Sequence, residues 1–334
     1  MIISRTPFRV SFFGGGTDYP TWYRENGGQV LSTSIDKYCY ISVRHLPPFF
    51  EHRYRVVYSK IENVGHYDEI QHPAVRAVLG HLGCEQGLEI HHDGDLPARA
   101  GLGSSSSFTV GLLAAIHALR GEYRSAQQLG AEAIHVEQEL IRESVGSQDQ
   151  IAVAYGGFNH IRFLPDGDIK VQPIILPLAR VAELQDHLLL FFTGLSREAS
   201  TIARSKIENL PRRRSQLAAM NGHVDAAIRL LGDGQADLAQ FGELLHETWM
   251  HKRELSDQVS NGDIDAMYES ARRAGARGGK LLGAGGGGFL LLFAPPERHA
   301  AVRAALSALT HVPFAFEHEG ARIVLYQPDR KAGH

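Results

Sequence analysis

The segment between Pro97 and Ser107 has the composition of an anion-binding loop. It reads Pro-Ala-Arg-Ala-Gly-Leu-Gly followed by four serines, with glycines at Gly101 and Gly103. Glycines let the backbone turn tightly, so that several N–H groups can point at one anion. A helix beginning at the serines would add the positive end of its dipole, and serine hydroxyls could reach a phosphate oxygen or a hydrated magnesium ion. The same residues also suit a serine helix cap after a flexible turn, and the loop alone leaves both interpretations open.

A second glycine-rich segment, Lys280–Phe289, contains four consecutive glycines from Gly285 to Gly288. Each glycine loses much backbone freedom on folding, so such a run is costly. It normally marks the close approach of the backbone to a ligand or to another strand. A mobile hinge is the alternative.

Two common nucleotide-binding motifs are absent from these segments. Lys280 is followed by Leu281 rather than by serine or threonine, so the Walker loop is missing. Gly101-Leu102-Gly103 has Ser106 where the third glycine of a dinucleotide-binding fingerprint would stand. The sequence therefore disfavours a P-loop NTPase and gives no support to a dinucleotide-binding fold.

Two carboxylates precede the middle of the chain at a spacing that a helix–turn–helix could bring to one cleft. Asp149 follows Gly146 in an otherwise apolar stretch, and Glu137 stands twelve residues upstream in an expected helix. A hydroxyl that accepts a phosphoryl group needs a carboxylate to orient it and to take its proton. One carboxylate could be that base while the other binds a metal. The spacing also fits an aspartate that caps a helix and a glutamate that faces solvent.

Near the N-terminus, Arg9 lies on an expected strand that leads through Gly14-Gly15-Gly16 to Asp18. An aspartate past a tight turn could accept hydrogen bonds from two vicinal hydroxyls, which is a common way to hold a sugar. An ordinary turn aspartate is the alternative.

The composition excludes several classes of protein. The net charge of −3 gives no sign of a nucleic-acid-binding surface, and the 18 histidines are scattered. Two cysteines in 334 residues exclude a disulfide scaffold and suit a reducing compartment. The first residues lack the pattern of a signal peptide, and every apolar run is far shorter than the ~20 residues that span a bilayer. We therefore expect a soluble, cytoplasmic protein with no membrane partner.

The length of 334 residues favours two domains, because a typical single domain has roughly 100–200 residues. We divide the chain into residues 1–190 and 191–334. Strands and helices do not alternate strictly, so we expect an α+β protein rather than a doubly wound sheet. The strands are expected at 9–13, 38–44, 54–58, 88–92, 188–193, 288–293 and 321–326. Helices are expected at 104–119 and 125–142 and through most of 196–273, with a hairpin turn at 165–168.

In their order and spacing, these segments resemble the GHMP kinases, the family of galactokinase, homoserine kinase, mevalonate kinase and phosphomevalonate kinase. The serine-rich loop resembles their Pro-x-x-x-Gly-Leu-Gly-Ser-Ser nucleotide loop, and Lys280–Phe289 resembles their third, glycine-rich motif. Pro7–Tyr19 is similar to the opening segment in which galactokinases have Gly-Glu-His-Thr-Asp. Here that segment reads Gly-Gly-Gly-Thr-Asp, so galactose itself is not the expected substrate.

The Gly-Gly-Gly-Thr-Asp form resembles bacterial D-glycero-D-manno-heptose 7-phosphate kinases and the related fucokinase-like branch. Three further patterns are similar to that subgroup: Gln148-Asp149-Gln150 followed by Gly156-Gly157-Phe158-Asn159, Thr193-Gly194-x-x-Arg197, and His246-x-x-Trp249-x-x-Lys252-Arg253. The resemblance implies an N-terminal domain like ribosomal protein S5 domain 2 and a ferredoxin-like α+β domain behind it.

The resemblance also implies roles for individual residues. Asp149 would be the catalytic base, Arg9 would steady the reacting groups, and Ser105 and Glu137 would bind Mg²⁺. ATP would be held by Pro97, Gly101, Leu102, Gly103, Ser104, Ser105 and Ser106, together with Gly285, Gly286 and Gly287. The sugar would be held by Gly15, Gly16, Thr17, Asp18, Thr193 and Arg197.

The function implied is transfer of phosphate from ATP to the anomeric hydroxyl of D-glycero-D-manno-heptose 7-phosphate. The product would be the 1,7-bisphosphate, on a route to GDP-heptose for lipopolysaccharide or capsule. The phosphate already on this substrate calls for a cation, for which Arg197 is the first candidate and Lys252 and Arg253 are the next. A kinase of a free sugar such as L-fucose and a sensor that binds sugar and ATP without turnover are the alternatives. Whether the chain forms a homodimer is left open.

Overall fold

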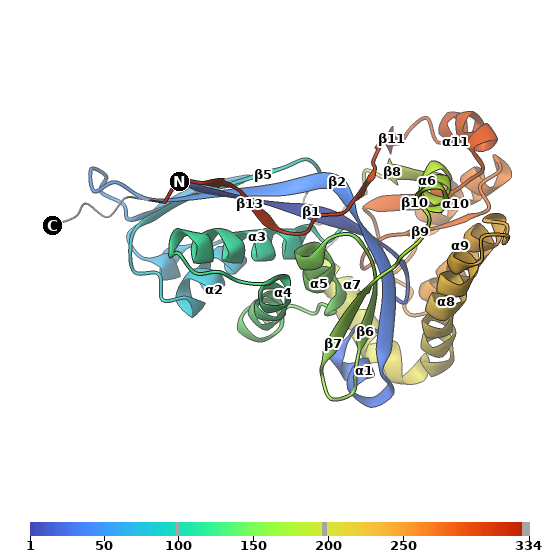
Figure 1. Ribbon diagram of the computed structural model, residues 1–334, viewed down its shortest axis with the longest axis horizontal. Coiled ribbons are helices and arrows are strands. Elements are labelled where there is room, and N and C mark those ends of the chain that lie inside the picture. The colour runs from blue at the N-terminus through green and yellow to red at the C-terminus, as the bar shows by residue number, and fades with distance from the viewer. Residues whose placement is uncertain (98–99, 196–198, 329–334) are drawn as a thin grey trace.

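The computed structural model describes residues 1–97, 100–195 and 199–328. These residues form two β-sheets with helices packed against them (Figure 1). The mixed composition of helices and strands confirms the α+β class. Within the part of the chain that the structure describes, no helix has both the length and the apolar character that crossing a membrane requires.

The larger sheet is organised around two long antiparallel strands, β1 (Ile2–Phe13) and β2 (Gly28–His45). One end of β2 pairs with β5 and the other with β6, so this strand runs along most of the sheet (Figure 1). The path β13-β1-β2-β5-β3-β4 is completed by β12 and β6, which pair with β2, and by β7, which pairs with β6. The remaining strands are β3 (Tyr54–Val57), β4 (Ile61–Val64), β5 (Leu88–Gly94), β6 (Phe158–Phe163), β7 (Ile169–Pro173), β12 (Phe316–Glu317) and β13 (Arg322–Tyr326).

Helix α3 (Ser104–Leu119) packs on β1 and β2 and is the central helix of this half of the molecule. Its residues from Ser106 to His117 are all buried. A helix surrounded in this way needs small or apolar side chains on every face, and Ser104–Leu119 has that composition. The helices α2 (Pro73–His81), α4 (Ala126–His135) and α5 (Gln148–Tyr155) pack against it, and the short helix α1 (Pro20–Asn26) follows β1.

The smaller sheet has the order β11-β8-β10-β9, with all neighbours antiparallel, and lies at one end of the molecule (Figure 1). Its strands are β8 (Leu188–Phe192), β9 (Gly278–Leu281), β10 (Phe289–Phe293) and β11 (Thr310–His311). The helices of this half are α6 (Leu178–Asp186), α7 (Ala199–Asn209), α8 (Arg214–Gly232), α9 (Ala239–Arg253), α10 (Gly262–Arg273) and α11 (His299–Ala305).

Most elements expected from the sequence are present, and the exceptions have physical causes. The helix expected over 125–142 ends early, because α4 passes at His135 into a π-helical turn, Val136–Leu140. The strands β12 and β13, near the end of the chain, pair with β2 and β1 of the larger sheet, and no local sequence pattern predicts which sheet they join. The division at residue 190 remains a prediction, and it falls within β8.

Candidate active site

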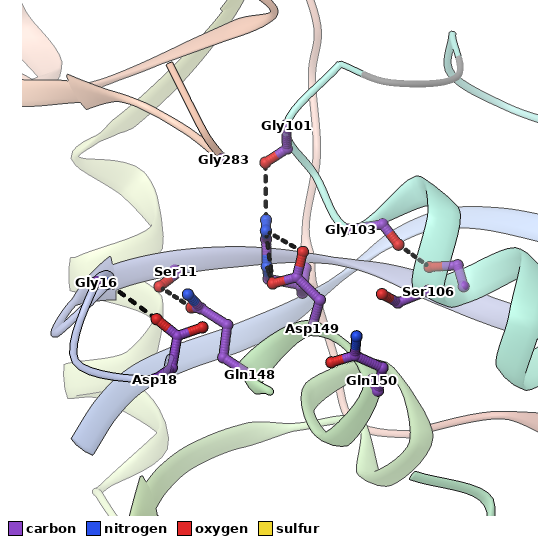
Figure 2. Close-up of polar contacts among 12 residues, drawn as sticks. Ser11, Gly16, Asp18, Gly101, Gly103, Ser106, Gln148, Asp149, Gln150 and Gly283 are labelled. Atoms are coloured by element: carbon purple, nitrogen blue, oxygen red, sulfur yellow. Dashed lines mark hydrogen bonds and ion pairs between the residues drawn. The ribbon is translucent and has the colours of Figure 1, made fainter. Parts of the chain in front are cut away.

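A single cleft gathers the two glycine-rich segments and the carboxylates of the sequence analysis. Its lining includes Gly101 and Gly103–Ser106 from the first glycine-rich segment and Gly283 and Ala284 from the second. The β1–α1 turn contributes Gly15, Gly16, Asp18 and Tyr19, and further lining residues come from the segment between Glu143 and Asp149. Figure 2 shows Asp149 between the Gly103–Ser106 side of this cleft and the Asp18 side.

The two glycine segments touch through their backbones, which explains why they lack side chains there. A Cβ on Gly101 would lie 2.6 Å from the carbonyl oxygen of Leu282, and one on Gly283 would lie 2.4 Å from the Cα of Gly101. Gly103 adopts the left-handed conformation, with φ at 76°, and is the residue from which α3 begins. The first N–H groups of a helix have no partners within it, so the cleft meets the electropositive end of α3. This arrangement suits a phosphate group.

Arg9 ties Asp149 to the first glycine segment. Its Nε lies 2.8 Å from Oδ1 of Asp149, its Nη2 lies 2.8 Å from Oδ2, and its Nη1 donates to the carbonyl of Gly101 at 2.8 Å (Figure 2). The arginine is 2% exposed, whereas the side chain of Asp149 is 28% exposed. The pair therefore fixes the direction of a carboxylate that still reaches the cleft.

Asp18 lies on the opposite side of the cleft and is 2% exposed. The backbone N–H of Gly16 donates to its Oδ1 at 2.8 Å. Burial raises the pKa of Asp18 above its usual range, and the bond from Gly16 acts in the opposite direction. The α4–α5 loop approaches so closely that a Cβ on Gly146 would lie 1.8 Å from the Asp18 carboxylate.

Two polar residues of this region were not predicted as site residues. The hydroxyl of Ser11 donates to Oε1 of Gln148 at 2.8 Å, and both side chains line the cleft (Figure 2). Ser11 stands two residues from Arg9 on the same strand, and that period places both side chains on one face of a sheet. The sequence signal was therefore available for Ser11.

Glu137 is buried beside the serines of α3, because the π-helical turn carries it inward. The hydroxyl of Ser106 donates to its Oε2 at 3.0 Å, and the side chain of Gln150 donates to the same oxygen. Its Oε1 is buried and has no hydrogen bond to the described residues. Burial raises the pKa of Glu137 to about 7. A π-helical turn inside a helix is often found at a functional site.

The oxygen ligands of this corner fit a magnesium ion. Glu137 offers a carboxylate oxygen without a partner, and the hydroxyl-bearing Ser105 lines the same cleft. Among the described residues, no group of three or more histidine, cysteine, aspartate or glutamate side chains could hold a metal. Magnesium is commonly bound by one or two carboxylates together with water and substrate phosphates, so a single carboxylate is sufficient.

Three lysines also line the cleft: Lys206, Lys252 and Lys280. Of these, only Lys252 was expected to bind a ligand, as a candidate for the distal phosphate. Nζ of Lys280 donates to the carbonyl of Phe12 at 2.9 Å, and Nζ of Lys252 donates to the carbonyls of Leu281 and Gly283 at 2.7 and 2.8 Å. Burial lowers the pKa of Lys280 to about 7 and that of Lys206 to about 8, and it lowers the pKa of Lys252 as well.

The structure does not bring Gly285, Gly286 and Gly287 into the lining of the cleft. A Cβ on Gly285 would lie 2.7 Å from the Cα of Val259, and one on Gly287 would lie 2.4 Å from the carbonyl oxygen of Leu195. These glycines therefore allow close packing of backbone against backbone. The adjoining Gly283 and Ala284 face the cleft in their place.

Several other predicted residues contact protein rather than the cleft. Thr17 is buried and donates to the carbonyl of Gly14, and Thr193 donates to the carbonyl of Gly288. Leu102 is buried, and its carbonyl accepts from the backbone N–H of Arg9. Pro97 is likewise not among the residues that line the cleft.

The three cation candidates for a distal phosphate differ in where the structure places them. Arg197 lies outside the described residues. Arg253 pairs with Asp265 at 2.8 Å and does not line the cleft. Lys252 does line it, but two of its donors are already used by backbone carbonyls.

Two models of known protein families match this chain. The model described as the GHMP kinases N terminal domain matches residues 69–157, and the model described as GHMP kinases C terminal matches residues 216–311. The chain belongs to the GHMP kinase family. The first match includes the serine-rich loop, Glu137 and Asp149, and the second includes the glycine-rich segment from Gly283.

Curated GHMP kinases are similar along most of this chain. A D-glycero-alpha-D-manno-heptose 7-phosphate kinase of Campylobacter jejuni is 29% identical over 96% of this chain and 98% of its own length. The bifunctional fucokinase/GDP-fucose pyrophosphorylase of Arabidopsis thaliana is 25% identical over 84% of this chain, which matches 28% of that protein. A galactokinase of Thermococcus kodakarensis is 25% identical over 84% of this chain and 85% of its own length.

Solved structures of GHMP kinases share the fold. A D-glycero-D-manno-heptose 1-phosphate kinase from Bacteroides thetaiotaomicron superposes with a TM-score of 0.79, covering 97% of this chain and 98% of its own at 23% identity. A phosphomevalonate kinase of Streptococcus pneumoniae gives a TM-score of 0.73 over 95% of this chain and all of its own (100%), at 14% identity. At these identities the likeness concerns the fold alone.

Proposed function

We propose that this GHMP kinase is an ATP- and magnesium-dependent sugar kinase that phosphorylates the anomeric hydroxyl of D-glycero-D-manno-heptose 7-phosphate. The observation that carries the proposal is the position of Asp149, held by Arg9 in the cleft that the N-terminus of α3 enters. A carboxylate that faces a phosphate-binding helix end is suited to orient an acceptor hydroxyl in line with a phosphoryl group.

In the proposed reaction, the anomeric oxygen attacks the γ-phosphorus of ATP, the bond from that phosphorus to the β,γ-bridging oxygen breaks, and ADP leaves. Asp149 accepts the proton of the attacking hydroxyl. Arg9 keeps the carboxylate pointed at that hydroxyl. Ser104, Ser105 and Ser106, with Gly101 and Gly103, bind the phosphates of ATP.

Two other groups of residues complete the proposed site. Glu137 and Ser105 would hold Mg²⁺, which when bound neutralises charge on the β- and γ-phosphate oxygens. Asp18, with the backbone of Gly15 and Gly16, binds hydroxyls of the sugar. The backbone N–H of Gly16 orients this carboxylate, which lines the cleft.

The choice of acceptor is supported by the Campylobacter relative, which matches this chain over nearly its full length. The fucokinase relative matches over 28% of its own length, so it supports the acceptor class more weakly. On this basis we place the product, heptose 1,7-bisphosphate, on a cytoplasmic route toward GDP-heptose for surface polysaccharide. A homodimer stays open, and residues 1–190 and 191–334 remain the proposed domains.

ADP release with a panel of acceptors tests the proposal. Purified protein with magnesium and ATP is given heptose 7-phosphate, free D-glycero-D-manno-heptose or L-fucose. The highest kcat/KM is expected for heptose 7-phosphate. Turnover of L-fucose alone would favour the free-sugar kinase, and binding of sugar and ATP without ADP release would favour the sensor.

A further inference from the structure

Lys206 is a buried cation at the acceptor side of the cleft. It comes from α7, is 5% exposed and lines the cleft together with Gly16, Asp18 and Tyr19. Its Nζ lies 5.7 Å from the centre of the Tyr19 ring. Tyr19 and Asp18 both belong to the turn between β1 and α1, so Lys206 lies beside that turn in the wall of the cleft.

Lys206 differs from the other cations of the cleft in having no hydrogen bond or ion pair with the described residues. Arg9, Lys252 and Lys280 all donate to carboxylate or carbonyl oxygens of the chain. Within the described residues, the Lys206 ammonium makes neither a hydrogen bond nor an ion pair. Its donors are therefore available to a ligand.

A buried ammonium without a counter-charge is costly, which is why the pKa of Lys206 falls to about 8. The negative charges of Asp18 and Asp149 offset this cost only in part, because the pKa remains below its ordinary value. A neutral sugar hydroxyl would give Lys206 a hydrogen bond but no opposite charge. An anionic group would give it both.

We propose that Lys206 binds the phosphate group already present on the acceptor, and that it thereby selects a sugar phosphate over the free sugar. This inference rests on the proposed function, in which the phosphates of ATP lie at the N-terminus of α3. The acceptor's own phosphate is then the anion that reaches the Lys206 side of the cleft. This role was not predictable from the sequence, because a lysine on a helix usually extends into solvent.

The test compares two acceptors in Lys206→Met, a variant that keeps the length of the side chain and removes its charge. Against wild type, kcat/KM for heptose 7-phosphate should fall about 30-fold more than kcat/KM for free heptose, mainly through KM. Lys170→Met, which removes one positive charge from an exposed position on β7, should leave the ratio unchanged. The melting temperature of Lys206→Met should not drop, since the variant removes a charge that has no partner.

Equal losses on both acceptors, or no loss on heptose 7-phosphate, would overturn the role of Lys206 and leave the kinase proposal standing. Calorimetric titration of wild type and Lys206→Met with the same two sugars tests whether the phosphate site exists even if the protein is not a kinase. Tighter binding of heptose 7-phosphate than of free heptose, dependent on Lys206 but without ADP release, would uphold the phosphate site and contradict the kinase. Equal affinity of wild type for both sugars would overturn the phosphate site.

Discussion

Arg9 meets both carboxylate oxygens of Asp149, through Nε at 2.8 Å and Nη2 at 2.8 Å. The third nitrogen of the guanidinium holds the carbonyl of Gly101, so a single side chain sets the position of the carboxylate relative to the first glycine segment. The two-point contact depends on the planar fork of arginine, which lysine cannot reproduce.

The first prediction concerns this pair. Arg9→Lys should lower kcat by about 10-fold or more, because Asp149 loses its second contact and part of its orientation. In a double-mutant cycle with Asp149→Asn, the losses should be strongly non-additive, since the arginine acts through the aspartate. Steady-state kinetics of the two single variants and the double variant measure this. Additive losses would show that Arg9 acts independently of Asp149.

The second prediction concerns magnesium. Glu137→Gln should raise the magnesium concentration needed for half-maximal activity by about 10-fold or more, because an amide oxygen is a weaker ligand than a carboxylate. Glu139→Gln, an exposed residue of the same turn, is the matched control and should leave the magnesium dependence unchanged. A Glu137→Gln enzyme with the magnesium dependence of wild type would place the ion elsewhere.

The third prediction concerns the contact between Gly146 and Asp18. Because a Cβ at Gly146 would lie 1.8 Å from the carboxylate, Gly146→Ala must displace Asp18. The KM of the sugar acceptor should rise by about 10-fold, while the KM of magnesium-ATP should stay within about 3-fold. The control is Gly222→Ala on α8, where a Cβ has open space around it. Equal increases in both KM values would argue that the loop, rather than Asp18, is disturbed.

The fourth prediction is a pH dependence of stability caused by Lys280. Its pKa in the folded protein is about 7, against an ordinary value of 10.5. Between these values the unfolded chain binds the extra proton, so the lysine's contribution makes the folded state more stable as the pH rises. The pKa values of buried Lys206 and Lys252 are also lowered, so these lysines likewise make the folded state more stable as the pH rises.

Urea denaturation of wild type and Lys280→Met at pH 7 and pH 8.5 isolates the contribution of Lys280. The free energy of unfolding of wild type should gain more over this interval than that of the variant. An equal change in the two proteins would mean that Lys280 does not titrate in this range.

Features encoded over a few neighbouring residues were predicted from the sequence. Helix α3 spans the expected residues 104–119, although its N-cap is Gly103 and no serine side chain caps it. The hairpin at residues 165–168 joins β6 and β7 as expected. Asp149 also lies in the cleft with the serine-rich loop, since both belong to short segments with distinctive composition.

Features that depend on tertiary contacts were not predictable in this way. The inward direction of Glu137 depends on a π-helical turn, and no residue pattern in Val136–Leu140 specifies one. Lys206 and Lys252 lie on helices, where a lysine normally faces water. The run of glycines correctly indicated a close backbone approach. Which of these glycines face the cleft and which face protein depends on the segments at Val259 and Leu195, which lie far away in the sequence.

The turnover of Asp149→Asn is the sharpest test of the proposed phosphoryl transfer. The variant keeps the shape of the side chain and loses a carboxylate that can accept a proton. We expect kcat to fall at least ~100-fold while the dissociation constant of magnesium-ATP stays within about 3-fold of wild type. Near-normal turnover in this variant would contradict the proposal that Asp149 is the base of a phosphoryl transfer in this cleft.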